Sequence, residues 1–326
     1  MNSDRRRFVF RTLPVTAVYP LLSFAQSLPD TARVIIGYPP GGPVDVVGRK
    51  LAEQLNGRLA RNVIVENRPG AAGRLAIAAL KAAPVDGSAI LVTPASVVTM
   101  YPHIYKNLGY DVFNDLAPVS LVAVTSFALA VGPATPAVRS LDELVVWCRA
   151  NPARAQCGNA GAGSLPHFMA MLLARETNVD FTHVPYRGGL DAMQAVAGGQ
   201  VSAAIATEAA ALALAQAGKI RVLATTDGDR STFFPQVPAF RELGYPGLTQ
   251  REWFAAFMPA KTPDDLIASA ADGIRAALRE RDVRDLWQRI ALSAESSTPA
   301  ELRTALRTEH DFWGPVIRAS GFSPEA

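Results

Sequence analysis

A pair of glycines just before a predicted helix is the first feature of this chain with a clear chemical use. The apolar run Val34-Ile35-Ile36 is typical of a buried strand, and the break Tyr38-Pro39-Pro40-Gly41-Gly42 follows it. Apolar residues then recur at helical spacing from Val44, with Pro43 suited to the first helical position. The first amides of a helix have no partner within it, and the helix dipole is positive there. The opening can therefore bind a carboxylate or a phosphate, although a tight turn without a ligand has the same pattern.

Similar loops follow other predicted strands. Glycine or small polar residues occur at positions 67–73, 93–96, 157–164 and 186–189, each time after a predicted strand. An acidic residue, Asp45, stands in the first turn of the first helix. We expect Asp45 to cap that helix by accepting backbone N–H bonds, with contact to a ligand as the alternative.

The side-chain groups that enzymes use are not assembled in recognisable patterns. The loop 157–164 lacks the Lys-Ser/Thr ending of a nucleotide phosphate loop and is not a Gly-x-Ser-x-Gly nucleophile turn. The four histidines, at 103, 167, 183 and 310, are scattered, and no Cys/His group has zinc-like spacing. We therefore predict that the protein is not an enzyme and needs neither a metal nor another cofactor.

The order of predicted elements favours an α/β fold. Strands alternate with helices, which favours parallel sheets with ligand sites at the carboxyl ends of the strands. The chain crosses into a second domain near Thr125-Ser126 and returns through the aromatic stretch 253–258. We predict two lobes around a hinged cleft, the first from residues 26–125 and 252–326 and the second from 126–251. The strands are predicted at 34–36, 63–65, 89–93, 121–124, 127–131, 181–184, 201–206, 220–226 and 253–258, and the helices from 43, at 75–82, 141–150, from 168, at 264–280 and at 299–319.

The first 25 residues have the pattern of an export signal. A basic head, Arg5-Arg6-Arg7, precedes an apolar stretch at 13–25 that is shorter than the about 20 residues a bilayer span needs. Small residues at Ser23 and Ala25 suit cleavage before Gln26. The basic head also fits a twin-arginine signal, and an ordinary secretory signal is the alternative.

Removal of this segment changes the charge balance. It holds four of the 32 basic and one of the 29 acidic residues, which leaves 28 of each. A formally neutral mature chain without a basic patch gives no reason to expect a nucleic-acid partner. Export also permits a disulfide between the only cysteines, Cys148 and Cys157, with two packed, reduced thiols as the alternative.

Nearly the whole mature chain resembles the Bug family of extracytoplasmic solute receptors, the periplasmic substrate-binding components associated with tripartite tricarboxylate transporters. The resemblance depends on the order of several short motifs, which are PPGGPVD at 39–45, VENRPGAAG at 65–73, PHIY at 102–105, APVSLV at 117–122, GAGS at 161–164 with His167, HVPYRG at 183–188 and GGQV at 198–201.

The resemblance implies a type II periplasmic-binding-protein fold, a "Venus flytrap" that holds a small carboxylate between its lobes. Backbone groups and ordered waters of the first-lobe loops would meet one carboxylate, and the second lobe would add the loop 159–164, His167 and the turn 186–188. The candidate ligand-binding residues are Tyr38, Pro40, Gly41, Gly42, Asp45, Thr93, Ser96, Asn159, Ala160, Gly163, Ser164, His167, Tyr186, Arg187 and Thr207.

Several candidates also have a structural interpretation. Ser164 can cap the helix that begins near Pro166, which is compatible with ligand contact. His167 and His183 can be packed, hydrogen-bonded side chains, and Tyr186 can cover the hinge. Arg187 can be a solvent-exposed side chain.

One departure from the family pattern bears on the ligand. Relatives commonly carry Asp-Asn after the strand at 201–206, where the aspartate can meet a ligand ammonium group, whereas this chain has Thr207-Glu208. We therefore expect a ligand without an α-amino group, such as a mono- or dicarboxylate or an aromatic or keto acid, unless Glu208 turns into the cleft.

The resemblance implies capture for transport, by a monomer that delivers its ligand to the membrane subunits of a tripartite tricarboxylate transporter. A periplasmic receptor that docks on a sensor protein is the alternative, because it would use the same pocket.

Overall fold

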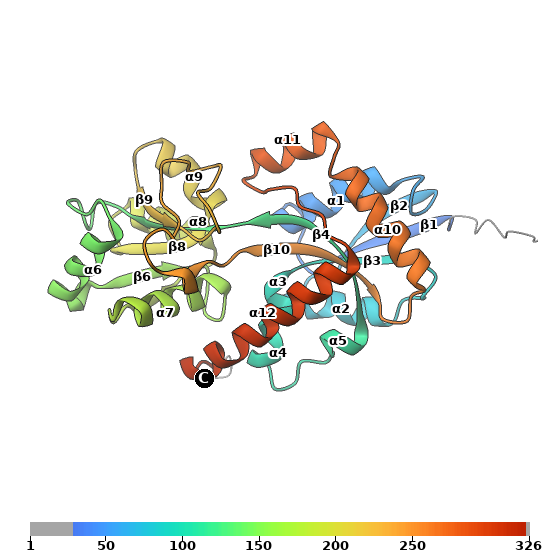
Figure 1. Ribbon diagram of the computed structural model, residues 1–326, viewed down its shortest axis with the longest axis horizontal. Coiled ribbons are helices and arrows are strands. Elements are labelled where there is room, and N and C mark those ends of the chain that lie inside the picture. Colours follow the sequence, from blue (N-terminus) through green and yellow to red (C-terminus); the bar gives the residue numbers. More distant parts are fainter. Residues whose placement is uncertain (1–28, 324–326) are drawn as a thin grey trace, which may run out of the picture.

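Two five-stranded sheets form the framework of the computed structural model, which describes residues 29–323 (Figure 1). The predicted export signal lies outside the described residues. The first sheet has the order β2-β1-β3-β10-β4 and contains β1 (Thr31–Ile36), β2 (Asn62–Asn67), β3 (Ala89–Pro94), β4 (Leu116–Thr125) and β10 (Glu252–Pro259). The second has the order β7-β6-β8-β5-β9 and contains β5 (Phe127–Val131), β6 (Gln156–Asn159), β7 (Thr182–Pro185), β8 (Ala203–Thr207) and β9 (Arg221–Thr225).

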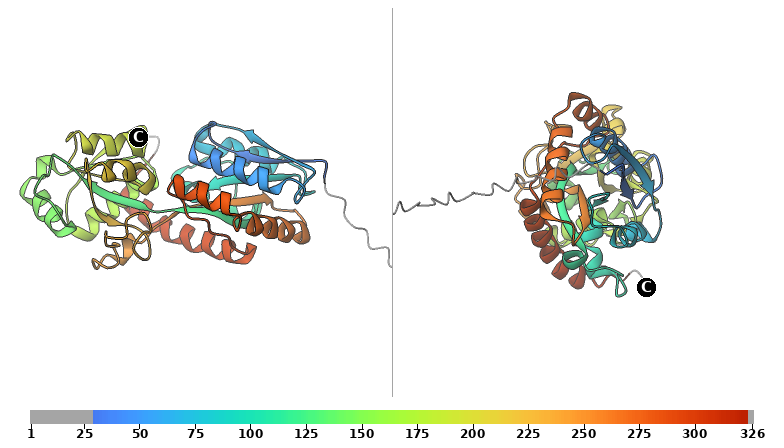
Figure 2. Two further views of the ribbon diagram at one scale, coloured as in Figure 1. Left: turned by 90° about the horizontal axis from the view of Figure 1, so that it is seen from above. Right: turned by 90° about the vertical axis from the view of Figure 1, so that its right-hand side faces the viewer.

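Helices cover both faces of each sheet, so that two α/β lobes lie end to end (Figures 1 and 2). The second lobe carries α6 (Leu141–Ala150), α7 (Leu165–Thr177), α8 (Gly189–Ala197) and α9 (Glu208–Gln216). The first lobe carries α1 (Pro43–Leu55), α2 (Arg74–Lys81), α3 (Ala95–Thr99), α4 (Tyr101–Ile104), α5 (Val112–Asp115), α10 (Asp264–Ala277), α11 (Arg281–Arg289) and the start of α12 (Pro299–Ser320). Two-sided cover explains why every residue of β3 is buried.

The pairing of the strands places the functional loops at the hinge. β4 ends at Thr125, beside the start of β10 at Glu252, and β5 begins two residues later at Phe127. β3 is antiparallel to β10, and β1 and β2 run parallel to β3, so all three end at the hinge. In the second lobe β8 is antiparallel to β5, with Thr207 opposite Phe127, and β6 and β7 run parallel to β8. The carboxyl ends of the parallel strands in both lobes therefore lie at the hinge.

Helix α12 connects the two lobes. Its first half contributes Leu302 and Leu306 to an apolar cluster of the first lobe. Its second half contributes Trp313 and Ile317 to the core cluster of the second lobe. A reciprocal capping box between Thr298 and Glu301 fixes its start, and Figure 1 shows it running beneath both lobes.

The predicted α/β fold is confirmed, and the differences lie in short, strongly charged or alanine-rich helices. The helix predicted at 264–280 ends at Ala277, and the sequence analysis missed α11, in which Val283 and Trp287 are the buried residues. It also missed the alanine-rich α9, since alanines give little amphipathic contrast. Leu59, which continues the apolar spacing of α1, lies beyond its end at Leu55.

Both cysteines are buried free thiols, which agrees with the reduced alternative rather than a disulfide. Burial raises the pKa of Cys148 to about 11 and that of Cys157 to about 12, so neither is a reactive thiolate near neutral pH. Within residues 29–323 no helix combines the length and apolar character that a bilayer span requires.

Candidate functional site

Asp45 organises the first loop of the candidate site. Its carboxylate accepts hydrogen bonds from the Gly41 amide at 2.9 Å, from Arg49 Nε at 2.8 Å and from Asn67 Nδ2 at 2.8 Å. Burial alone would raise the pKa of Asp45, but these hydrogen bonds, above all that of Arg49, lower it. Asn67 also donates to the Tyr38 carbonyl at 3.0 Å. Asp45 therefore joins the loop after β1 to the end of β2, and its side chain is only 3% exposed.

The opening of α1 keeps few free amide donors. Gly42 is the N-cap residue, and Pro43, at the first helical position, has no N–H. The Gly41 amide is already bonded to Asp45, and the φ of Gly41, 91°, lies in the left-handed region that favours glycine. The first helical hydrogen bond runs from the Val46 amide to the Gly42 carbonyl, so among the described residues the amides of Gly42, Val44 and Asp45 remain as the donors at this opening. Pro40 and Gly41 are exposed beside it, so an anion can reach these amides.

The loops after β1 and β2 are packed backbone against backbone. A Cβ on Gly37 would lie 2.6 Å from the Gly73 Cα, and the Tyr38 ring covers Gly73 from the other side. Residues 70–73 all have positive φ, and Ala71 and Ala72 adopt this strained conformation without being glycine. This close approach explains why both motifs carry small residues.

A carboxylate from β10, which was not predicted from the sequence, is bonded to the segment after β3. Glu252, the first residue of β10, accepts a hydrogen bond from the Ser96 amide at 3.0 Å, at the start of α3. Burial raises its pKa to about 7, against the lowering effect of hydrogen bonds from Ser96. Thr93 is buried at the end of β3, whereas Ser96 is partly exposed. The amide of Ser96, a candidate ligand-binding residue, is therefore already bonded to a residue 156 positions away in the sequence.

In the second lobe the glycine loop is held by its own helix. Ser164 is the N-cap of α7, where its hydroxyl accepts from the His167 amide at 3.4 Å and donates to the Gly161 carbonyl at 2.7 Å. His167 Nδ1 accepts from the Gly163 amide at 3.0 Å. Asn159 Oδ1 accepts from the Gly161 amide at 3.2 Å. Asn159 and His167 are both buried and hold the loop through these hydrogen bonds. Ala160 and Gly163 of the loop are partly exposed.

The histidines of this lobe are neutral near physiological pH. Burial lowers the pKa of His167 to about 4, and the neighbouring His183, whose ring lies 4.9 Å away, adds to the effect. Burial also lowers the pKa of His183. A neutral His167 keeps the lone pair that accepts the Gly163 amide, so its role in the loop does not require a charge.

The second residue that the sequence analysis missed is Phe322, just after α12. A Cβ on Gly163 would lie 2.8 Å from the Phe322 ring, and that ring lies 5.6 Å from His167 and 5.5 Å from Phe168, centroid to centroid. Gly163 has a φ of 76°, so glycine is needed there for both the backbone and the space. The end of the chain thus packs against the glycine loop of the second lobe.

The remaining candidates lie around this loop. The Tyr186 ring covers Gly158, since a Cβ built on Gly158 would lie 3.2 Å from that ring. The Tyr186 amide donates to the Asn159 carbonyl at 2.9 Å. Arg187 is exposed, and no ion pair involves it within the described part of the chain. Thr207 ends β8 with its side chain partly exposed. The next residue, Glu208, is buried and accepts the Ser231 hydroxyl at 2.7 Å, so it is directed toward the loop after β9.

The structure therefore divides the predicted residues into two groups. Buried side chains set the shape of the loops: Asp45, Thr93, Asn159 and His167. Exposed or partly exposed groups remain for a ligand: Tyr38, Pro40, Gly41, Gly42, Ser96, Ala160, Gly163, Ser164, Tyr186, Arg187 and Thr207. Amide and hydroxyl donors with one guanidinium can hold a carboxylate. Within residues 29–323 no cluster of side chains could hold a metal ion.

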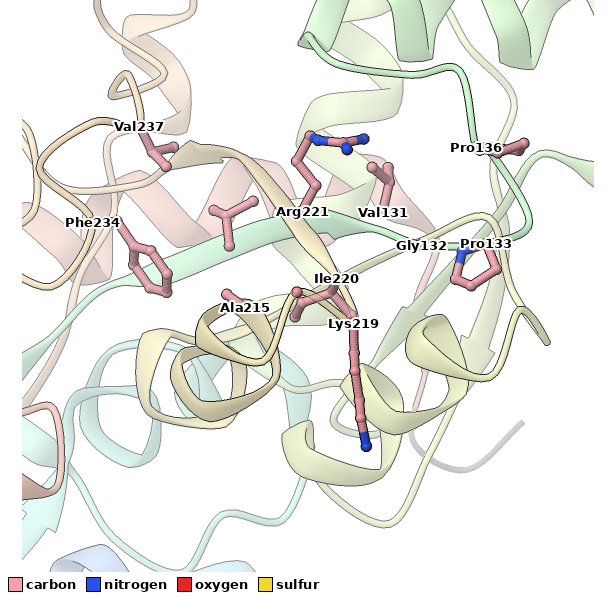
Figure 3. A pocket seen from close by; sticks show the side chains of 12 residues that line it. Val131, Gly132, Pro133, Pro136, Ala215, Lys219, Ile220, Arg221, Phe234 and Val237 are labelled. Atoms are coloured by element: carbon pink, nitrogen blue, oxygen red, sulfur yellow. The ribbon is translucent and has the colours of Figure 1, made fainter.

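Two cavities lie away from these loops. One of about 650 Å³ lies beside α12 and is lined by Asp227, Arg251, Trp253 and Glu309 among others. The other, of about 470 Å³, lies where β5 ends at Val131 and β9 begins at Arg221, at the end of the second sheet remote from the hinge (Figure 3). Neither is lined by the glycine-rich loops.

Comparisons with known proteins agree with the fold and with the motifs. The family described as the tripartite tricarboxylate transporter family receptor matches residues 47–322. The BugT protein of Bordetella pertussis is 32% identical over 290 residues, which covers 89% of each chain.

Two solved structures from Rhodopseudomonas palustris, each 26% identical, are also similar. Rpa4515 with adipate has a TM-score of 0.77 over 90% of this chain and 98% of its own, and MatC with bound malate has 0.72 over 88% and 98%. These neighbours are binding proteins and not enzymes, which confirms the expectation that this chain is not an enzyme. The chain belongs to the tripartite tricarboxylate transporter receptor family, whose members are periplasmic solute-binding proteins.

Proposed function

We propose that this protein captures a small carboxylate in the periplasm and delivers it to the membrane subunits of a tripartite tricarboxylate transporter. The observation that carries the proposal is that the glycine-rich loops of both lobes follow those ends of their parallel strands that lie at the hinge. The malate and adipate of the two structural neighbours support a carboxylate ligand.

Capture needs binding and closure but no chemistry. In the first lobe the Gly42 and Val44 amides replace part of the water around the carboxylate, and in the second lobe the Arg187 guanidinium supplies a positive charge. Closure about the hinge follows only to the extent that the ligand binds the closed state more tightly than the open one. The moving lobes are residues 26–125 with 252–326 and residues 126–251, in a monomer whose first 25 residues direct export, by a twin-arginine or an ordinary secretory route, and are removed.

The ligand is a mono- or dicarboxylate or an aromatic or keto acid without an α-amino group. The buried position of Glu208 and its bond to Ser231 support this choice, because Glu208 is then not available at the end of β8 for a ligand ammonium group. The α-amino acids therefore form a separate set in the test below.

The test is a thermal-shift screen of protein purified from the periplasm, before and after refolding without ligand. A ligand at one hundred times its Kd stabilises the folded state by about 2.7 kcal/mol. We expect shifts with non-amino carboxylates and a clear loss of affinity in Arg187→Gln, but not in Arg61→Gln, whose side chain is 72% exposed and pairs with Asp30 far from the loops. Absence of any shift after refolding would overturn the proposal, and tight binding of α-amino acids alone would overturn the choice of ligand.

A further inference from the structure

Glu252 adds an acidic group to the first-lobe part of the candidate site. Its carboxylate accepts a hydrogen bond from the Ser96 amide. Its negative charge adds to the rise that burial causes in the pKa of Tyr38, in the loop after β1, and in that of Tyr101, in α4. Ser96 and Tyr38 are both candidate ligand residues. Glu252 therefore lies next to two candidate ligand residues of this lobe, although β10 brings it there from a part of the chain that follows the second lobe.

No cation neutralises this carboxylate. Within residues 29–323 Glu252 takes part in no ion pair, and the nearest basic side chain along the chain, Arg251, pairs with Glu295 at 2.6 Å. The other acid beside it, Glu309, accepts the Trp253 indole N–H at 2.6 Å and adds negative charge to the same region. Above pH values near 7, where burial has placed the pKa of Glu252 and of Glu309, the first-lobe wall next to α3 thus offers hydrogen-bond acceptors and negative charge, and the Ser96 amide is already used.

These surroundings are unfavourable for a second carboxylate. Two like charges a few ångströms apart repel strongly when water is partly excluded, and a carboxylate cannot donate a hydrogen bond to another one. A hydroxyl or an ammonium group remote from the ligand's carboxylate has the opposite chemistry, because it donates to an acceptor such as Glu252.

We infer that Glu252 is a specificity-determining residue of the ligand site, which excludes a second carboxylate from the α3 wall and accepts a hydrogen-bond donor of the ligand. This inference rests on the proposed function and narrows it, from carboxylates in general to monocarboxylates that carry a distal hydroxyl or ammonium group. Adipate and malate, which the structural neighbours contain, are dicarboxylates and so belong in the test.

The test compares ligands that differ only in the distal group. Titration calorimetry of the refolded protein about one pH unit or more above 7, where Glu252 is ionised, compares adipate with 6-hydroxyhexanoate and succinate with 4-hydroxybutanoate, and gives a selectivity ratio for each pair. We expect wild type to prefer the hydroxy acid at least tenfold. In Glu252→Gln, whose amide oxygen can still accept the Ser96 N–H, we expect that preference to fall at least tenfold through a gain in dicarboxylate affinity. Glu53→Gln is the control, an exposed acid of the same lobe that pairs with Lys50 on α1, and should change the ratio less than threefold.

The outcomes separate the two proposals. Binding of neither acid of any pair to wild type would overturn the proposed function, and this inference with it. Tighter binding of the dicarboxylates to wild type would overturn the inference alone, without any variant. An unchanged ratio in a folded Glu252→Gln protein would do the same.

Discussion

Replacement of Asp45 by alanine should weaken both the fold of the first loop and ligand binding. The side chain is 3% exposed and accepts three hydrogen bonds, from Gly41, Arg49 and Asn67. A hydrogen bond to a charged group contributes about 1.5–3 kcal/mol. The Arg49 side chain is 52% exposed, so solvent screening limits that pair to about 1 kcal/mol or less. Water can also satisfy the exposed Gly41 amide, which leaves a total loss of roughly 2–3 kcal/mol.

Thermal unfolding measures this loss directly. With about 2–4 °C per kcal/mol for domains of about 150–250 residues, the melting temperature should fall by about 5–10 °C. Glu53→Ala is the matched control, because Glu53 lies on the same helix in an exposed pair with Lys50 and should cost less than about 0.5 kcal/mol. Since the pKa of Asp45 is lowered in the folded state, its contribution is complete above the unfolded pKa and is lost as the pH falls through the folded one. The difference between wild type and Asp45→Ala should therefore shrink in acid. A melting temperature no lower than that of Glu53→Ala would refute this account of the loop.

Two further predictions concern a buried acid and a close backbone contact. Burial raises the pKa of Glu208 to about 7 in the folded state, so folding favours its protonated form, and stability should fall as the pH rises from about 4.5 to about 7. Glu208→Gln should match wild type near pH 4.5 and be more stable than wild type at pH 8 by up to about 3 kcal/mol, which thermal unfolding would show as a higher melting temperature; equal melting temperatures at pH 8 would contradict this. Gly37→Ala places a Cβ 2.6 Å from the Gly73 backbone and should cost more than about 2 kcal/mol or abolish folding, as measured by soluble yield and thermal unfolding. The control Gly228→Ala meets nothing within 4 Å and should be close to neutral, so an equal effect of both substitutions would argue against a steric cause.

The loops at the ends of the strands could be predicted from the sequence because their requirements are local. Gly41 and Gly163 have positive φ, which favours glycine whatever surrounds them, and Pro43 and Ser164 have fixed roles at helix starts. The parallel strands follow from the alternation of apolar runs with helices, and the predicted ends of β3 and α6 agree with the structure to within one residue. These features depend on the backbone conformation of a few neighbouring residues.

Glu252 and Phe322 could not be found in the same way, because their roles depend on contacts between distant parts of the chain. Glu252 reaches Ser96 only because β10 lies between β3 and β4 in the first sheet. The sequence shows that the chain returns to the first lobe, but it does not show where the returning strand is inserted in the sheet. Phe322 reaches Gly163 only because α12 crosses from one lobe to the other. A single acid before Trp253 and an aromatic residue near the end of the chain have no pattern of their own.

The path of α12 also constrains how the lobes can close. A helix of 22 residues is about 33 Å long, and this one has buried side chains in the clusters of both lobes. On the first-lobe side His103 Nε2 donates to the His310 carbonyl at 2.8 Å. On the second-lobe side Ile317 belongs to the core cluster and Phe322 packs against Gly163. Pro315 lies between these contacts and cannot donate the N–H that would bond to the carbonyl four residues earlier. A rotation of the lobes therefore has to bend the helix near Pro315 or separate one of its ends from its lobe. Bending is the less costly of the two, because a helix is least stiff where a backbone hydrogen bond is missing, and it keeps Phe322 against Gly163.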